Sequence, residues 1–246
     1  MHRVRVPKEQ LRSGAIRLHS AELRHLRDVL RLKRGAHIEI FDGEGGSFLA
    51  EVTAIGASAA DIALKSAIER RSESPLTLTL AVAITKGAKL DWVVEKATEL
   101  GVSLVVPFTC ERTVPERGDF ASRVSRWRRI AAAAAAQSGR TICPRIDEVT
   151  DFSAIGQQAA RHDRSLLFWE RRGAALEPPE ERNVQSVVVA TGPEGGFTEA
   201  EAAQAEATGF TIATLGPRIL RAETAAVAAV ALAQHRWGDL GRSRAG

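Results

Sequence analysis

The feature that most constrains the fold is a series of short apolar runs separated by helix-like segments. The runs are continuous, without the apolar–polar alternation of a strand that has one face in water, and they occupy Leu76–Thr85, Ser103–Phe108, Ser165–Trp169, Ser186–Ala190 and Phe210–Leu215. Such strands are buried on both faces, as happens when helices cover both sides of a parallel sheet. A helical pattern follows four of the runs, at Lys89–Leu100, Asp119–Gln137, Thr198–Thr208 and Glu223–Trp237. We therefore predict an α/β domain with a parallel sheet.

The predicted helices carry further signals. Gly101 and Gly209 follow two of them, where a helix commonly ends in a left-handed residue. Thr198 and Glu201 have the spacing of a capping box. The second helix contains the alanine run Ala131–Ala136, and the last helix is also rich in alanine. Because alanine favours helices and lets them approach closely, we predict tight packing, either on the sheet or at a subunit interface.

The first 70 residues have a different pattern. Strand-like runs occur at Val4–Val6, His37–Phe41, Ser47–Thr53 and Asp61–Lys65. The glycine-rich segment 42–46 resembles a nucleotide-binding turn, but it leads into a strand rather than a helix, so we interpret it as a hairpin loop. Between the first two strands we expect a short helix, with Ser20 as its N-cap and Leu23, Leu26, Val29 and Leu30 on its apolar face.

A polar run that ends in proline, Glu69–Pro75, separates the two patterns. Runs of this kind are typical of domain boundaries. We assign residues 1–70 to a small β-rich domain and residues 75–246 to the α/β domain.

Composition argues against several classes of protein. No run approaches the roughly 18 apolar residues of a membrane span, and the basic N-terminus lacks the apolar segment of a signal peptide. Cys110 and Cys143 are the only cysteines, and no second pair of Cys or His accompanies them as zinc ligands. We interpret both as core thiols. We expect a cytoplasmic protein without a metal site and without membrane association.

Positive charge gathers in two segments. Residues 1–34 hold ten Lys and Arg against three acids, and residues 112–145 hold eight Arg against two acids, although the net charge of the whole chain is only +4. Clustered positive charge attracts a phosphate backbone by releasing its counterions. The alternative is a solvated arginine-rich surface. Two separate clusters favour a nucleic-acid partner.

Two glycine-rich turns each follow a predicted strand and precede a predicted helix. The first is Thr191–Phe197 and the second is Leu215–Arg221. Ligands of α/β sheets bind at the carboxyl ends of strands, and glycine lets the backbone approach a ligand closely. The first of these segments, taken alone, is best interpreted as a plain tight turn. Two such segments at the same edge of the sheet predict a cofactor pocket. Arg221 has a structural alternative, an ion pair with Glu194 or Glu223 at the start of the last helix.

The chain resembles the ribosomal RNA small-subunit methyltransferase E family, which is similar in fold to the SPOUT, or trefoil-knot, methyltransferases. The resemblance covers nearly the whole sequence. It is carried by Lys86-Gly87, by residues 95–102 (EKATELGV), by 137–140 (QSGR), by 192–197 (GPEGGF) and by 215–225 (LGPRILRAETA), and at the N-terminus by His2-Arg3, His25-Leu26 and Val29-Leu30-Arg31.

The resemblance implies a fold, an activity and partners. It implies a PUA-like N-terminal β-barrel that binds RNA, followed by a SPOUT α/β domain whose C-terminal part forms a knot. Members transfer a methyl group from S-adenosylmethionine to N3 of a uridine in 16S ribosomal RNA, and they are homodimers. The partner expected here is therefore 16S rRNA or the small ribosomal subunit, with S-adenosylmethionine as cofactor.

The resemblance also implies site residues. Three segments would hold the cofactor, and the residues that we predict are Phe168, Trp169, Glu170, Thr191, Gly192, Glu194, Gly195, Leu215, Gly216, Ile219, Leu220 and Arg221. For catalysis we predict Arg221, whose guanidinium would stabilise a uracil anion, with Glu194 or Glu223 as proton acceptor. The residues predicted to contact RNA are Arg3, Arg5, His25, Arg31 and Arg140.

Two other functions remain open at this point. One is the same methyl-transfer fold acting on another RNA base or on a 2′-hydroxyl. The other is a non-catalytic RNA-binding assembly factor that retains the pocket. The intact glycines of both turns and the presence of Arg221 favour an enzyme.

Overall fold

The chain folds into two compact units. The computed structural model describes residues 1–11, 14–19, 23–70, 72–113, 119–176 and 183–242. The first unit comprises Met1–Glu73 together with Ala135–Cys143, and the second comprises Ser74–Ala134 and Pro144–Gly246. The division after Glu73 lies inside the polar run that separates the two sequence patterns. The return of Ala135–Cys143 to the first unit was not foreseen, because no change in composition marks it.

The second unit contains a seven-stranded sheet in which every strand pairing is parallel. The strand order is β12-β10-β11-β6-β7-β8, and β9 also pairs with β7. The strands are β6 (Thr77–Ala83), β7 (Leu104–Thr109), β8 (Arg145–Ile146), β9 (Thr150–Asp151), β10 (Arg164–Phe168), β11 (Ser186–Thr191) and β12 (Thr211–Ala213). The prediction of a parallel sheet is confirmed.

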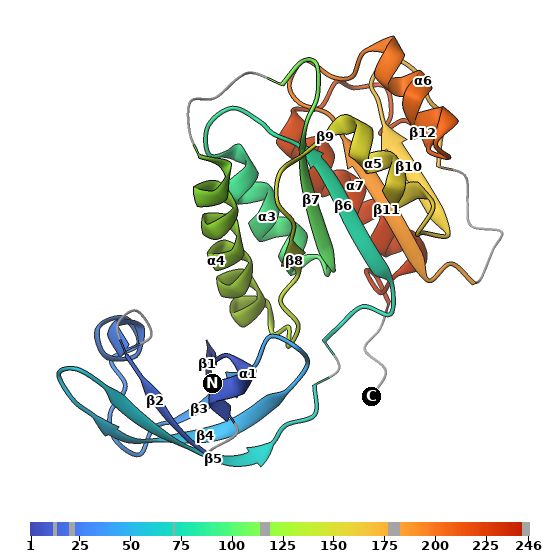
Figure 1. The fold of residues 1–246 in the computed structure, drawn as a ribbon. Coiled ribbons are helices and arrows are strands. Elements are labelled where there is room, and N and C mark those ends of the chain that lie inside the picture. The colour runs from blue at the N-terminus through green and yellow to red at the C-terminus, as the bar shows by residue number, and fades with distance from the viewer. Residues whose placement is uncertain (12–13, 20–22, 71, 114–118, 177–182, 243–246) are drawn as a thin grey trace. The chain divides into compact units, whose positions relative to one another are not determined.

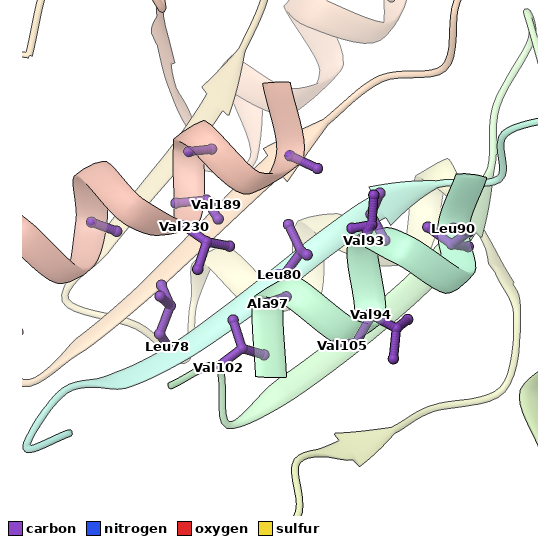
Figure 2. Close-up of a cluster of buried hydrophobic side chains, with 14 of the residues drawn as sticks. Leu78, Leu80, Leu90, Val93, Val94, Ala97, Val102, Val105, Val189 and Val230 are labelled. Atoms are coloured by element: carbon purple, nitrogen blue, oxygen red, sulfur yellow. The ribbon is translucent and has the colours of Figure 1, made fainter. Parts of the chain in front are cut away.

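Helices cover both faces of this sheet (Figure 1). On one face lie α3 (Lys89–Glu99), α7 (Ala222–Trp237) and the first part of α4 (Phe120–Ser138), and on the other lie α5 (Phe152–Ala159) and α6 (Glu199–Ala207). Because side chains alternate along a strand, β6 directs Leu78 and Leu80 into the first core and Ala81 into the second. Figure 2 shows the first core between the sheet and helices α3 and α7.

Three elements of this unit were not predicted. Strands β8 and β9 have two residues each, which is too short for any periodicity to be recognised. Helix α5 has only eight residues and contains Gly156, which normally weakens a helix. The glycine is needed there, because a Cβ at position 156 would lie 2.8 Å from the Thr208 side chain.

Strand β12 is enclosed by the chain that leaves β10. One edge of β12 pairs with β10, and the other forms a parallel bridge with Ala174, which follows β10 in the sequence. The Ala174 N–H donates to the Ile212 carbonyl (3.1 Å), and the Thr214 N–H donates to the Ala174 carbonyl (3.1 Å). Strand β12 thus lies between β10 and the segment that leaves β10, an arrangement that a trefoil-knot fold requires.

The first unit contains a curled five-stranded sheet with the order β1-β3-β4-β5-β2. Its strands are β1 (His2–Arg5), β2 (Ala15–Leu18), β3 (His37–Phe41), β4 (Ser47–Ile55) and β5 (Ala60–Ala67), and a short helix, α1 (Lys8–Leu11), follows β1. Only β1 and β3 run parallel. Among the described residues no pairing joins β1 to β2, so the sheet is a half-barrel. Strand β2 and helix α1 were not predicted.

The helix predicted between the first two strands differs from expectation. Ser20 lies outside the described residues, and the described part contains a π-helix, η1 (His25–Val29). Leu23 and Leu26 are buried, as predicted, but Val29 is 67% exposed. The wider turn of a π-helix moves later residues off the face that α-helical spacing would give them.

Candidate active site

A cavity of about 540 Å³ lies at the carboxyl ends of β10, β11 and β12 in the second unit. It is bounded by the residues that end β10, by the turn after β11, by the loop after β12 and by the start of helices α3 and α7. The lining residues are Lys89, Phe168, Trp169, Glu170, Thr191, Gly192, Pro193, Glu194, Gly196, Phe197, Thr214, Leu215, Gly216, Arg218, Ile219, Leu220, Arg221, Ala222 and Ala225. This is the edge of a parallel sheet at which ligands bind.

The structure brings the predicted cofactor residues together around this cavity, with one exception. Gly195 does not line it. A Cβ at position 195 would instead lie 3.1 Å from the Arg112 side chain, so this glycine is on the opposite side of the turn. Sequence reasoning missed Lys89 and Thr214, which also line the cavity, whereas Arg218 lies in the predicted Leu215–Arg221 loop without having been singled out.

The first glycine-rich turn is held from three directions. The Arg112 guanidinium donates to the carbonyls of Gly195 (2.9 Å) and Phe197 (3.3 Å). The Phe197 ring is fully buried and packs against the rings of Phe108 and Phe152. The Thr198 hydroxyl accepts from the Glu201 N–H and completes the predicted capping box of α6. The turn is therefore a fixed wall of the cavity.

The second loop exposes its backbone to the cavity. The Gly216 N–H donates to the Thr214 hydroxyl oxygen (3.2 Å), and Gly216 has φ +101°, a conformation that favours glycine. Ile219 is 85% exposed. Within the described part of the chain, the N–H groups of Ile219 and Leu220 have no hydrogen-bond partner. They are available to the acceptor edge of a ligand.

Three charged side chains form an ion cluster beside the cavity. The Lys89 ammonium lies 2.7 Å from a Glu194 carboxylate oxygen and 3.7 Å from Glu223. Burial would raise the pKa of Glu194, but the hydrogen bond and the charge of Lys89, together with hydrogen bonds from backbone N–H groups, lower it. The same hydrogen bond raises the pKa of Lys89. Each member of the Lys89–Glu194 pair thus stabilises the charged form of the other.

Arg221 is not part of this cluster. The ion pair with Glu194 or Glu223 that the sequence left open is absent among the described residues, because Lys89 occupies that position. Arg221 is the N-cap of α7, its side chain is exposed, and it has no ion pair in the described structure. Its guanidinium is therefore free to meet a ligand at the cavity.

Two buried polar atoms next to the cavity lack partners. The Trp169 Nε1 and the Thr191 Oγ1 make no hydrogen bond to any residue that the structure describes. Unpaired buried polar groups are rare in native proteins, and they commonly mark a site that a ligand or water completes. Both residues line the cavity.

The residues predicted to contact RNA belong to the first unit, and burial divides them. Arg5 and Arg31 are exposed, and Arg31 has φ +52°, an uncommon conformation for a residue other than glycine. The side chain of His25 lies outside the described part. Arg140 is 4% exposed and pairs with Glu73 at 2.8 Å, while the guanidinium of Arg3 is also largely buried.

Two further properties concern the described residues as a whole. No helix among them has the length and apolarity needed to cross a membrane. No group of three or more His, Cys, Asp or Glu side chains in that part of the chain is arranged to hold a metal ion.

Known proteins resemble the chain along most of its length. A family described as the RNA methyltransferase domain matches residues 72–234, and one described as the RNA methyltransferase PUA domain matches residues 20–65. The ribosomal RNA small subunit methyltransferase E of Synechocystis is 34% identical over 94% of this chain and 76% of its own, and that of Bacillus subtilis is 30% identical over 83% of each. The crystal structure of the Neisseria gonorrhoeae enzyme of the same name, bound to S-adenosyl methionine, has a TM-score of 0.89 and 33% identity, and covers 97% of this chain and 99% of that one.

Proposed function

The chain belongs to the ribosomal RNA small subunit methyltransferase E family, and we infer that it is an S-adenosylmethionine-dependent methyltransferase that acts on N3 of a uridine in 16S ribosomal RNA. The observation that carries this function is the cavity at the carboxyl edge of the sheet, built from both glycine-rich segments. The first unit, with its PUA-like sheet, supplies the RNA-binding part.

The cavity fits S-adenosylmethionine. Its volume of about 540 Å³ is within the range of small-molecule sites. The free N–H groups of Ile219 and Leu220 suit an adenine edge, and the unpaired Trp169 and Thr191 offer further polar contacts. When bound, the cofactor supplies a methyl group made electrophilic by its sulfonium. The protein then has to orient the base and handle one proton.

We propose that Arg221 stabilises the uracil anion. The N3–H of uracil is a weak acid, so methylation requires its proton to leave or its developing charge to be compensated. A fixed cation beside the uracil oxygens favours the anionic form. Arg221 is the unpaired cation at the start of α7, where it borders the cavity. Glu194 and Glu223 are the candidate proton acceptors, and both lie beside Lys89.

Arg221→Ala should abolish methylation while S-adenosylmethionine binding survives. The rate should fall by about 100-fold or more, because removing one charge-stabilising group at a reacting centre has effects of that order. Methyl incorporation into rRNA measures the rate, and calorimetry measures cofactor affinity. Arg161→Ala, an exposed arginine outside the cavity, is the control. Near-normal turnover of the Arg221 variant would refute the assignment.

The modified position is tested by mass mapping of methylated nucleotides. A deletion strain should lack one N3-methyluridine in its 16S rRNA, and the restored chain should return it. A methyl group returned at a 2′-hydroxyl, or at another base, would assign the fold a different substrate. No methyl group at all, together with retained RNA binding, would favour an assembly factor.

For RNA contact the proposal rests on the exposed residues. Arg5 and Arg31 lie free on the first unit, and His25 belongs to the π-helix between them in sequence. Arg3 and Arg140 also carry positive charge, but their burial favours a structural role for both. The homodimer and the cytoplasmic location implied by the resemblance also belong to the proposal. Helix α7 buries Ala226, Ala229 and other small residues in its own unit, which accounts for much of its alanine content without a partner.

A further inference from the structure

Two helices that border the cavity begin with residues that disfavour a helix start. Helix α3 has Ala88 as its N-cap, which offers no capping side chain, and Lys89 as its first residue. Helix α7 has Arg221 as its N-cap, also without a side-chain cap. Helix N-termini favour acidic residues and capping oxygens. By contrast α6, whose N-cap Thr198 does not line the cavity, has a complete capping box. Residues that break a local preference at a site are candidates for function.

The position of Lys89 explains its presence. Its ammonium lies 2.7 Å from Glu194 and 3.7 Å from Glu223, so it stands between the two candidate proton acceptors. The Lys86 N–H also donates to Glu194 (3.3 Å), which ties that carboxylate to the turn before α3. The Glu223 oxygen that faces Lys89 is buried and has no hydrogen bond within the described residues. Lys89 is thus its nearest compensating charge.

The ion pairs of Lys89 bear on whether the Arg221 guanidinium is free, because Lys89 occupies the carboxylates with which Arg221 could otherwise pair. Arg221 lies two residues before Glu223, at the start of the same helix. If Lys89 were absent, both carboxylates would lack their cation, and Arg221 would be a cation at hand to replace it. An arginine held by a carboxylate is no longer available to a substrate, because the two groups satisfy each other.

We propose that Lys89 is a positioning residue of the methyl-transfer site: it holds Glu194 and Glu223 in one ion cluster and thereby leaves the Arg221 guanidinium free for the uracil oxygens. The inference rests on the function proposed above. It assigns Lys89 and Arg221 different tasks, one structural and one directed at the substrate.

The test compares Lys89→Met with Lys89→Arg and with a matched control. Lys96→Met is that control, because Lys96 lies on the same helix and also pairs with two carboxylates, Glu95 (2.7 Å) and Glu99 (2.9 Å), away from the cavity. For Lys89→Met we expect kcat on 16S rRNA to fall by about tenfold or more. S-adenosylmethionine affinity should change by less than about threefold. Lys89→Arg should recover most of the rate, and Lys96→Met should resemble the wild type.

A double-mutant cycle with Glu194→Gln adds a readout that a general loss of stability would not give. Both changes act on one ion cluster, so the double variant should lose no more activity than the worse of the two single variants. Losses that multiply would show independent roles and overturn the proposal.

The outcomes separate this inference from the function on which it rests. A wild-type protein that methylates no rRNA overturns both. An active wild type with a Lys89→Met variant as active as Lys96→Met overturns the inference alone. A Lys89→Met variant that loses cofactor affinity by more than about tenfold also overturns it, because Lys89 would then be a cofactor contact rather than a positioning residue.

Discussion

At the scale of single residues, Gly196 shows why one position in the first turn admits only glycine. Its φ of +67° is in the left-handed region, where a side chain is unfavourable by about 1–2 kcal/mol. A Cβ at this position would also lie 2.5 Å from the carboxylate of Glu170. Both Gly196 and Glu170 line the cavity, so a side chain at position 196 would strain the turn and displace the Glu170 carboxylate within the cavity.

Gly196→Ala should therefore lower S-adenosylmethionine affinity by about tenfold or more, which corresponds to roughly 1.4 kcal/mol. Titration calorimetry measures the change. Gly209→Ala is a matched control: its φ is +102°, but the nearest atom to an added Cβ is 3.7 Å away and the residue is outside the cavity. The control variant should have the same kind of backbone strain at position 209 but an unchanged affinity for S-adenosylmethionine. Equal cofactor affinity in the two variants would contradict the proposed role of the turn.

At the scale of elements, Arg3 joins strand β1 to the end of helix α4 within the first unit. Its guanidinium donates to the carbonyls of Ala135 (3.1 Å), Ala136 (3.0 Å) and Arg140 (3.0 Å). The last carbonyls of a helix have no partner inside the helix, so a buried arginine can satisfy them. Its Nε also lies 3.0 Å from Glu39, a buried carboxylate. Burial would raise the pKa of Glu39, but hydrogen bonds from Arg70, Ser47 and Arg3 outweigh it and lower the pKa.

Arg3→Met should destabilise the first unit by about 3 kcal/mol, because it leaves helix carbonyls and part of a buried ion cluster without a partner. Hydrogen exchange of the β3 and β4 amides, followed by mass spectrometry, reports on this unit directly. Arg17→Met is the control, since Arg17 is exposed and its pair with Asp61 spans 3.5 Å; exposed pairs contribute about 0–1 kcal/mol. Unchanged protection in the Arg3 variant would contradict this structural role of Arg3.

At the scale of the whole molecule, the free positive charge is smaller than the sequence suggests. Within residues 1–34 and 112–145, several arginines are neutralised by neighbours: Arg27 by Asp28, Arg126 by Asp91 and Arg128 by Glu148. The exposed basic residues of the first segment that have no ion pair among the described residues are Arg5, Arg24, Arg31, Lys33 and Arg34. They are the groups best able to bind phosphates.

Affinity for 16S rRNA should consequently fall steeply with salt. If four phosphates are neutralised, raising the salt from about 50 to about 200 mM lowers the association constant by roughly 100-fold. The reason is that counterions released from the RNA gain less entropy when the surrounding salt is more concentrated. Filter binding or fluorescence titration across this range gives the slope. S-adenosylmethionine affinity, measured in the same buffers, should change far less. Binding of rRNA that is unchanged over this range would exclude the basic residues as the main contact.

The predictions from sequence succeeded where the signal was local. The apolar runs at β6, β7, β10 and β11 predicted a parallel sheet, and Thr198 with Glu201 predicted a helix start that the structure contains. The short helix near His25 is present, but the prediction that Val29 lies on its apolar face was wrong, because a π-helical turn changes which residues share the buried face without changing the residue types. Lys89 was missed because a lysine on a helix has no sequence signature that distinguishes a residue beside a ligand site from one on the surface.

By itself, the sequence determined the longer strands and helices of the α/β unit, the places of the glycine turns and the family that the chain resembles, because these follow from periodicity, backbone freedom and motif spacing within short stretches. Only the tertiary structure decided that Lys89, rather than Arg221, pairs with Glu194 and Glu223, and that Ala135–Cys143 belongs with the first unit. The reason is physical. Ion pairs form between whichever charges the packing brings within a few ångströms, and residues more than a hundred positions apart carry no mark in the chain of being neighbours in space.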